Sequence, residues 1–343
     1  MIGILLLNLG TPDAPKTREV RRYLRQFLSD PRVIDIHPIA RWLLLNLIIL
    51  PLRSPKSAAL YQKIWTPEGS PLLVHSQALA QGVGKSLGGE YAVELGMRYG
   101  QPSIEGAIKN LIRKNVSEIR VLPLFPQYAA SSTGSAIAEV YRVAKQEWDP
   151  PPLKILPPFF DQDGFVDGFK EIGRPILERV RPDHVLFSFH GLPERHIRKS
   201  DATETCLVAE DCCPSVNRPC RVEEKDVKSR YCYRFQCFAT AHAIAKKLNL
   251  NEQDYTVCFQ SRLGRTPWIK PYTDLVIPDL VKAGKKRLVV FCPSFVADCL
   301  ETLEEIGLRA NHSAKEAGAE VLELVPSLNA HSFWIQTVCE RVK

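Results

Sequence analysis

One histidine, His190, stands where an apolar run ends in a Gly/Pro turn. Residues 185–189 read VLFSF and are followed by Gly191, Leu192 and Pro193 after the histidine. An unbroken apolar run predicts a strand of a parallel sheet that is covered on both faces. The last residue of such a strand lies at the carboxyl edge, where open α/β sheets bind ligands. An imidazole held there could bind a metal ion or accept a proton, because its ordinary pKa is about 6.5.

A row of acidic residues forms the second candidate group. Residues 291–305 also run from an apolar strand into a helix, which we expect to begin at Pro293. In that helix Asp298, Glu301 and Glu305 are three and four residues apart, which places their carboxylates on one face. A solvated helix face explains most such rows, but like charges at this spacing repel unless a cation compensates them. We expect this row and His190 to face each other from two sister lobes.

Together these groups predict a loose, oxygen-rich site for a borderline divalent ion such as Fe(II). Three aromatic and two basic side chains could form its walls: Trp268, Phe295 and Tyr128, with Arg98 and Arg262 as partners for carboxylates. An imidazole, carboxylates and aromatic walls together suit the transfer of a metal ion to a flat, apolar ligand that carries acidic groups. Such a ligand must lose N–H protons when it binds the metal. His190 suits the proton-accepting role, which typically contributes a factor of about 10² to 10⁴.

Alternating strands and helices must position these residues. The 343-residue length favours two domains, and prolines near residues 150–158 mark a boundary. The second half repeats three strand-to-turn junctions of the first half in the same order. The turn 10–12 corresponds to 191–193, the strand that ends at Arg98 corresponds to the strand and turn 255–262, and the junction 122–125 corresponds to 291–295. We therefore predict two α/β lobes around a cleft, an N-terminal lobe over 1–150 and a C-terminal lobe over 151–327. The helix expected over 328–343 completes the first lobe.

Charge and hydropathy restrict the partners. The net charge is +7, but the basic residues are scattered and form no stripe with aromatics, so we expect no nucleic acid. Residues 39–52 are intensely apolar and carry Arg41, Trp42 and Arg53 within or beside them. This segment looks too short to span a bilayer and reads either as a buried helix or as an exposed apolar lip, which Trp42 and the arginines favour.

The first residues predict a strand and not a signal peptide, because no basic region precedes the apolar residues and no small-residue cleavage site follows them. We therefore expect the protein in the cytoplasm or at the inner face of the membrane. Ten cysteines in a reducing compartment are not expected to form disulfides. Four of them crowd together and suggest a metal: Cys206, Cys212, Cys213 and Cys220.

Over nearly its whole length the chain resembles the ferrochelatases. The matching motifs are LNLGTP (7–12), GSPL (69–72), MRY (97–99), PQY and STG (126–134), SFHGLP (188–193), QSRLG and PW (260–268), and FVADCLETLEE (295–305). The resemblance implies a lyase that inserts ferrous iron into protoporphyrin IX to give protohaem. It also implies two Rossmann-like lobes with parallel sheets flanked by helices, a porphyrin cleft, and an apolar lip that docks on a membrane.

By the same resemblance, His190 and Glu301 bind iron and handle protons, and Asp298 and Glu305 continue an acidic path. The helix that carries Glu301 and Glu305 is expected to be locally widened. Trp268, Phe295, Arg98 and Tyr128 are expected to line the porphyrin pocket.

Compared with most of the family, this chain carries an insertion of about thirty residues at about 199–231, with cysteines in the spacing C-x5-C-C-x6-C. The resemblance implies an internal [2Fe–2S] cluster, since some ferrochelatases carry one. A zinc site and free thiols are the alternatives, and Cys232 could replace one ligand. We expect Cys237 to have a structural role, and we expect Cys258, Cys292 and Cys339 to be small buried residues.

Two other functions stay open at this stage. A related enzyme could insert iron into coproporphyrin III or cobalt into sirohydrochlorin, although the apolar segment favours protoporphyrin. A haem-binding or iron-sensing module without chemistry would not need the acidic row.

Overall fold

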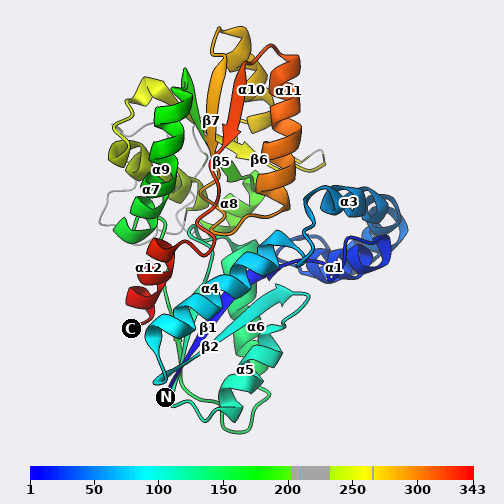
Figure 1. Ribbon diagram of the computed structural model, residues 1–343. Coiled ribbons are helices and arrows are strands. Elements are labelled where there is room, and N and C mark those ends of the chain that lie inside the picture. The colour runs from blue at the N-terminus through cyan, green and yellow to red at the C-terminus, as the bar shows by residue number, and fades with distance from the viewer. Residues whose placement is uncertain (202–206, 208–231, 265) are drawn as a thin grey trace. The chain divides into compact units, whose positions relative to one another are not determined.

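The computed structural model describes residues 1–201, 207, 232–264 and 266–343 (Figure 1). The chain forms two compact units. Unit 1 consists of Met1–Phe125, Ala130–Pro158 and Asn329–Lys343, and unit 2 of Pro126–Ala129 and Phe159–Leu328. Each unit contains a four-stranded parallel sheet flanked by helices, so the predicted fold class is confirmed.

The sheet of unit 1 has the strand order β2-β1-β3-β4. Its strands are β1 Ile2–Gly10, β2 Tyr91–Tyr99, β3 Ile119–Pro123 and β4 Leu153–Ile155. Its helices include α1 Thr17–Ser29, α4 Pro71–Leu87, α5 Ile104–Arg113, α6 Ser135–Ala144 after a π-turn η2 Ala130–Gly134, and α12 Ser332–Val342. The central strand is fully buried from Ile4 to Leu7, as its apolar sequence predicts.

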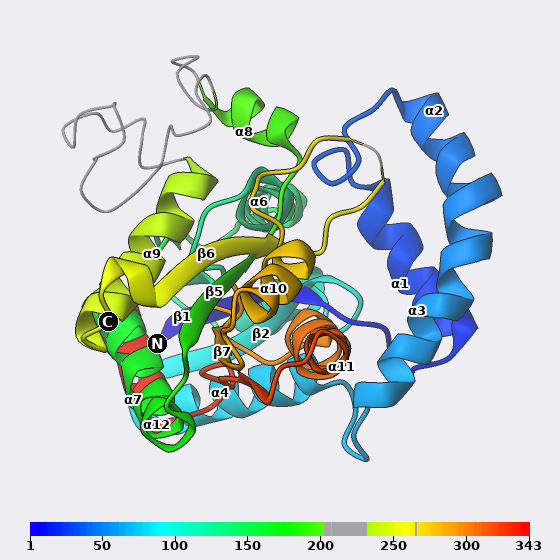
Figure 2. The same ribbon diagram turned by 90° about the horizontal axis from the view of Figure 1, so that it is seen from above.

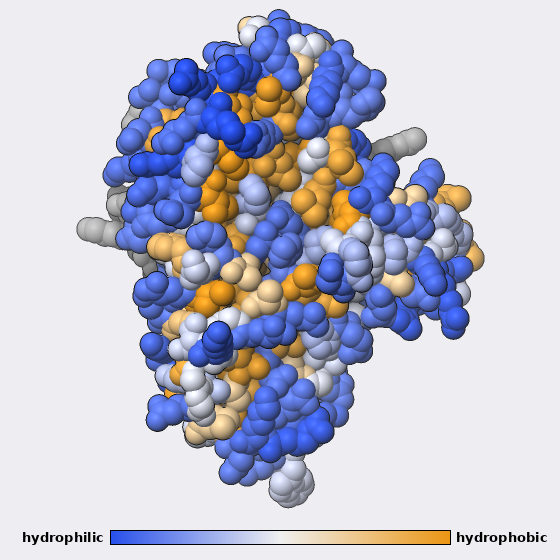
Figure 3. All heavy atoms as spheres, in the orientation of Figure 1, coloured by the Kyte–Doolittle hydropathy of each residue, from blue (hydrophilic) through white to orange (hydrophobic). Residues whose placement is uncertain are grey.

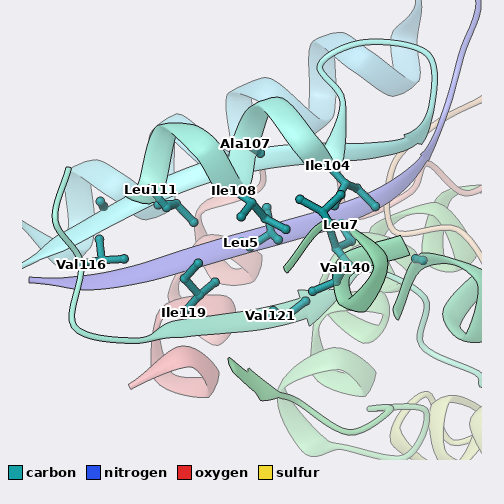
Figure 4. Packing of buried hydrophobic residues seen from close by; sticks show 13 residues of the cluster. Leu5, Leu7, Ile104, Ala107, Ile108, Leu111, Val116, Ile119, Val121 and Val140 are labelled. Carbon is teal, nitrogen blue, oxygen red and sulfur yellow. The ribbon is translucent and has the colours of Figure 1, made fainter. Parts of the chain in front are cut away.

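Leu5 and Leu7 of β1 point to the face covered by α5 and α6 (Figure 4). There they pack against Ile104 and Ile108 of α5 and Val140 of α6, all almost completely buried. Helix α5 begins at a capped end, where the Ser103 hydroxyl accepts a hydrogen bond from the Gly106 N–H at 3.0 Å. Helix α4 packs on β2 and on α12, so the C-terminal helix belongs to unit 1.

A continuous helical run follows α1 in unit 1 (Figure 2). It comprises α2 Pro38–Leu43, the π-helix η1 Leu44–Ile49 and α3 Leu50–Ile64, and α3 packs against α1. Six large apolar side chains in its first half are 44% to 66% exposed: Ile39, Trp42, Leu43, Leu47, Ile48 and Leu52. Apolar atoms also reach the outer edge of this region in the space-filling view (Figure 3).

The helix that carries this apolar segment is longer than the segment itself. The helix does not end near residue 52 but continues through two prolines, Pro51 and Pro55, to Ile64. Among the described residues, this 27-residue run is the one helix long and apolar enough to cross a membrane by length and composition. Its second half, however, buries Ser57, Ala58 and Tyr61, so the exposed apolar residues are confined to the first half.

The sheet of unit 2 has the order β6-β5-β7-β8, which repeats the order of unit 1. Its strands are β5 His184–His190, β6 Tyr255–Gln260, β7 Arg287–Phe291 and β8 Val321–Leu324. Its helices and helical turns are α7 Asp163–Val180, α8 Glu194–Ser200, α9 Tyr233–Lys247, η4 Glu252–Asp254, α10 Thr273–Lys282, the π-helix η5 Glu301–Ala310 and α11 Asn311–Glu316. Helices α7 and α9 pack on one face of the sheet and α10, η5 and α11 on the other (Figure 1).

One glycine lets α7 approach this sheet closely. A Cβ atom at Gly173 would lie 2.4 Å from the Phe291 ring of β7. Phe169, one turn earlier on α7, meets the same ring at 6.4 Å between centroids. The close approach packs α7 tightly against the end of β7, directly before the residues that lead into the acidic segment.

Candidate active site

His190 is the last residue of the central strand β5, as the sequence predicts. Its N–H donates to the Ser294 hydroxyl at 3.1 Å, and its ring atom Nδ1 lies 2.6 Å from the Gly191 carbonyl oxygen. A carbonyl oxygen can only accept, so Nδ1 must carry the proton. The lone pair of the neutral ring is therefore on Nε2, and no hydrogen bond from a described residue reaches that atom.

Two aromatic side chains flank the imidazole. The ring centroid of His190 lies 6.5 Å from Trp268 and 6.3 Å from Phe295. Trp268 is 9% exposed and its indole N–H donates to the Leu263 carbonyl at 2.8 Å. The structure thus places two of the three predicted aromatic wall residues, Trp268 and Phe295, beside His190.

Glu301 and Glu305 lie on η5, which is a π-helix over all ten residues. The widening implied by the resemblance is therefore present. Because a π-helix has more residues per turn than an α-helix, side chains four apart come closer to one line. This geometry brings the two carboxylates onto one face.

The Glu305 carboxylate is held by neutral donors from the end of β6. The Ser261 N–H donates at 2.9 Å and the Ser261 hydroxyl donates to the other oxygen. The Gln260 amide donates to Glu305 at 3.4 Å and to the main-chain oxygen of Glu301 at 2.8 Å. Ser261 adopts φ +67°, a left-handed conformation that is strained for a residue other than glycine.

Gln260 links β5 to η5. Its amide oxygen accepts from the Ser188 hydroxyl at 2.8 Å, two residues before His190. Sequence reasoning quoted the QSRLG motif but assigned no role to Gln260 or Ser261. The available signal was their position directly after a buried strand, at the same sheet edge as His190.

Two predictions about the acidic row were wrong. His190 and Glu301 do not face each other from two lobes, since both belong to unit 2 and β5 pairs directly with β7. Asp298 does not share a helical face with Glu301, because residues 292–299 form no helix. Asp298 is 5% exposed and accepts hydrogen bonds from the Thr302 hydroxyl at 3.0 Å and the Ser327 N–H at 3.2 Å.

The predicted basic residues are already paired within their own units. In unit 2, Arg262 contacts Asp274 at 2.8 Å and stacks 4.4 Å above the Tyr272 ring. In unit 1, Arg98 contacts Asp30 at 2.8 Å, and its Nε donates to the Ser135 hydroxyl at 2.7 Å. A substrate carboxylate at either arginine would share it with an existing partner.

Tyr128 lies in the short segment Pro126–Ala129 of unit 2. Its N–H donates to the Gln236 side chain on α9 at 2.5 Å. The same helix is anchored by Thr240, whose hydroxyl accepts from Gln127 at 2.9 Å. The segment that carries Tyr128 is thus held by two neighbouring turns of α9.

The four clustered cysteines, Cys206, Cys212, Cys213 and Cys220, lie outside the described residues. Within the described part of the chain, no group of three or more His, Cys, Asp or Glu side chains could hold a metal ion. The six described cysteines, including Cys258, Cys292 and Cys339, are buried, as predicted for those three.

Comparison with solved structures places the fold among the chelatases. The sirohydrochlorin chelatase SirB from Bacillus subtilis subspecies spizizenii, in complex with cobalt, matches with a TM-score of 0.53 at 10% identity, covering 99% of this chain and 93% of that one. SirB from Bacillus subtilis with Fe3+ matches with a TM-score of 0.52 at 14% identity, covering 80% and 90%. At such identities the likeness concerns the fold alone.

Sequence comparison then decides the family. The family description "Ferrochelatase" matches residues 1–343. A ferrochelatase from Coxiella burnetii is 50% identical over 342 residues, covering 100% of this chain and 93% of the relative. One from Legionella pneumophila is 47% identical over 336 residues, covering 98% and 97%. The chain belongs to the ferrochelatase family, metal-inserting lyases of haem synthesis, and the family predicted from the motifs is confirmed.

Proposed function

We propose that this protein inserts ferrous iron into protoporphyrin IX to form protohaem, with His190 and Glu301 at the reacting centre. The observation that carries the proposal is the state of His190, whose Nδ1 is occupied by the Gly191 carbonyl while Nε2 keeps a lone pair. A neutral Nε2 can bind a borderline divalent ion or accept a proton. Iron enters here as a substrate.

The described contacts support a division of labour. Iron insertion replaces two pyrrole N–H protons with one Fe2+, so two protons must leave. His190 is suited to accept them or to present the iron, and the carboxylates of Glu301 and Glu305 lie along η5, which Gln260 links to the strand of His190. Trp268 and Phe295 offer flat apolar surfaces for the macrocycle beside the imidazole. By resemblance, Arg98, Tyr128 and Arg262 contribute porphyrin contacts and Asp298 belongs to the acidic path.

Anaerobic incubation with Fe2+ and protoporphyrin IX, followed by visible spectroscopy, tests this function. His190→Ala and Glu301→Gln should abolish haem formation while porphyrin binding, measured by quenching of tryptophan fluorescence, persists. Glu316→Gln on α11 is a matched control, because that carboxylate is exposed and its one ion pair with a described residue is with His312. Full haem formation by both site variants would contradict the proposal. A wild type that binds porphyrin but forms no haem would favour a haem-binding or iron-sensing module.

Coproporphyrin III remains the alternative substrate. It has four propionates, whereas the exposed apolar side chains of α2 and η1 suit a less polar porphyrin. Direct competition between the two porphyrins at one iron concentration distinguishes them. A strong preference for coproporphyrin would overturn the choice of protoporphyrin.

We further propose that the first half of the run Pro38–Ile64 lies on a membrane surface and keeps the protein at the inner face of the cytoplasmic membrane. Support comes from the exposed side chains, among them Trp42 and Leu47, and from the buried face of α3 on α1. Leu47→Ser should weaken binding to anionic vesicles in a flotation assay about tenfold. Leu275→Ser, an equally simple change of an exposed leucine on α10, should not weaken it.

A [2Fe–2S] cluster on Cys206, Cys212, Cys213 and Cys220 is the third part of the proposal. Four thiolates are the usual ligand set of this cluster, and the absence of a C-x2-C pair makes a zinc ribbon a poorer fit. Protein purified without air should absorb beyond 300 nm (roughly 320–460 nm is expected for such clusters) and contain iron. Cys213→Ser should lose both signals, whereas Cys339→Ala should keep them. Zinc without iron would favour the zinc alternative, and a variant Cys232→Ser tests the substitute ligand.

A further inference from the structure

Tyr233, the first residue of α9, lies under the strand end that carries His190. Its hydroxyl donates to the His190 carbonyl oxygen at 2.7 Å and lies 3.4 Å from the Ser294 hydroxyl. The side chain is almost completely buried, at 6% exposed. Burial raises the pKa of the Tyr233 phenol well above its ordinary value, so it stays a donor at any physiological pH.

Both peptide groups of His190 are held by hydrogen bonds. The peptide between His190 and Gly191 accepts from Tyr233 through its oxygen and donates from its N–H to the Gln260 carbonyl at 2.8 Å. The preceding peptide donates from the His190 N–H to Ser294 at 3.1 Å. The plane of the His190–Gly191 peptide is thus fixed at both ends.

That plane decides where the Gly191 carbonyl lies. Because the next peptide starts from it, a rotation of the plane would move the Gly191 oxygen away from Nδ1, which now lies 2.6 Å from it. The bond to this oxygen determines the tautomer of the ring, and the tautomer determines whether Nε2 has a lone pair. Tyr233 therefore acts on the ring through the main chain.

We propose that Tyr233 is a positioning residue for His190, which keeps Nε2 unprotonated and aimed for iron insertion by clamping the His190–Gly191 peptide. The inference rests on the proposed role of His190. It assigns a part in the reaction to α9, because Tyr233 is not one of the predicted site residues and reaches His190 through its main-chain oxygen.

The first experiment reads the ring directly. Long-range ¹H–¹⁵N spectra of histidine-labelled protein give the tautomer and titration of each imidazole, and His190→Ala identifies the signal of His190. The wild type should show the Nδ1–H form, and Tyr233→Phe should populate the Nε2–H form. Tyr255→Phe is the matched control, because Tyr255 begins β6 at the opposite end of the same sheet and packs on Phe187; it should leave the His190 signal unchanged.

The second experiment measures iron insertion. Tyr233→Phe leaves a buried carbonyl oxygen without its donor, so kcat should fall about tenfold, while KM for porphyrin stays within about twofold. Tyr255→Phe should match the wild type. An identical His190 tautomer in Tyr233→Phe and the wild type, or unchanged kcat, overturns the inference.

Two further variants keep the test decisive. If Tyr233→Phe fails to fold, Ser294→Ala removes the neighbouring clamp and should shift the tautomer in the same sense, whereas Ser294→Thr, which keeps the hydroxyl, should restore it. A wild type that inserts no iron would defeat the proposed function, yet the tautomer measurement would still decide the role of Tyr233. An inactive His190→Ala with a normal Tyr233→Phe would defeat the inference alone.

Discussion

The two sheets share one strand order, but the acidic side chains at their carboxyl ends have different partners. In unit 1, Arg98 at the end of β2 forms an ion pair with Asp30. In unit 2, the corresponding edge carries Glu301 and Glu305, whose described hydrogen bonds come from an amide, a hydroxyl and a backbone N–H. One edge has its negative charge neutralised within the chain, while the other keeps charge available for a cation.

The network of unit 1 is closed. Asp30 accepts hydrogen bonds from Arg98, from the Tyr99 hydroxyl at 2.9 Å and from the Ser135 hydroxyl. Its other oxygen accepts from the Arg32 N–H at 2.7 Å. Such a buried, fully satisfied group contributes to structure, because breaking it leaves a buried charge without compensation.

The edge of unit 2 is open at two points. Nε2 of His190 has no donor or acceptor among the described residues, and the Glu301 carboxylate meets the neutral Cys299 thiol, while its main chain accepts the Gln260 amide. The shared strand order explains why polar groups gather at the carboxyl edge of both sheets. The balance of charge at each edge decides whether those groups stabilise the fold, as in unit 1, or are available to a ligand, as in unit 2. Four changes test this contrast, from the largest expected effect to the smallest.

Neutralising Glu301 should cost activity and spare stability. In Glu301→Gln the carboxylate that takes part in metal and proton transfer becomes a neutral amide of nearly the same shape, so kcat for iron insertion should fall by about 10² to 10⁴. The free energy of unfolding in urea should change by less than about 1 kcal/mol, since the main-chain bond to Gln260 remains. A variant that loses stability as well would remove the contrast between the two edges.

Neutralising Asp30 should lower stability, whereas neutralising Glu301 should lower activity. Asp30→Asn removes the nearer carboxylate of Arg98, which is 17% exposed, and leaves it the longer contact with Glu139 at 3.9 Å; loss of one partner of a buried pair costs about 3 kcal/mol. Urea unfolding measures the effect, and Asp13→Asn serves as the control, because its pair with Arg22 is exposed. Equal stability of the two variants would show that the unit 1 network is not structural.

The same network should make unit 1 sensitive to acid. Burial by itself would raise the pKa of Asp30, but hydrogen bonds from Ser135, the Arg32 N–H and Tyr99, with the charge of Arg98, lower it below 3.8. The group therefore adds stability that is complete above the unfolded pKa and is lost as the pH falls through the lower folded pKa. Thermal unfolding followed from pH 6 downward, to about pH 3, should show this loss. Asp30→Asn should flatten that part of the profile.

Removing one donor to Glu305 should have the smallest effect. Ser261→Ala keeps the N–H bond to Glu305 and loses the hydroxyl bond, which is worth about 1 kcal/mol. We expect kcat to fall about threefold to fivefold, with porphyrin binding unchanged. Ser261→Gly, which also lacks the hydroxyl but relieves the left-handed strain, should lose a similar share of the rate; if both variants keep the wild-type rate, the hydroxyl is not what Glu305 requires.

Much of the fold was readable from the sequence because it depends on local patterns. The apolar run before His190 predicted β5 and its last residue, and the three repeated junctions predicted two parallel sheets. Burial of Cys258 and Cys292 followed from their place in apolar strands. The motifs were specific enough to indicate the ferrochelatase family.

Other features depended on which strands pair, and no local pattern records that. The predicted C-terminal lobe, 151–327, contains both His190 and Glu301, but they follow strands a hundred residues apart, and only the pairing of β5 with β7 puts those strands side by side. Asp298 has helical spacing from Glu301, yet its carboxylate accepts hydrogen bonds from the Thr302 hydroxyl of η5 and from the Ser327 N–H. Spacing alone could not decide this, because a short polar side chain serves a helix start as readily as a helix face.

By itself, then, the sequence determined the residue types, the strand ends that present them and the family, since these follow from composition and order along the chain. The tertiary structure decided which groups are neutralised and which stay open: Asp30 reaches Arg98, Ser261 reaches Glu305, and Tyr233 reaches the His190 carbonyl only after folding. Hydrogen bonds and ion pairs act over a few ångströms, so partners distant in the chain become partners only when packing brings them together.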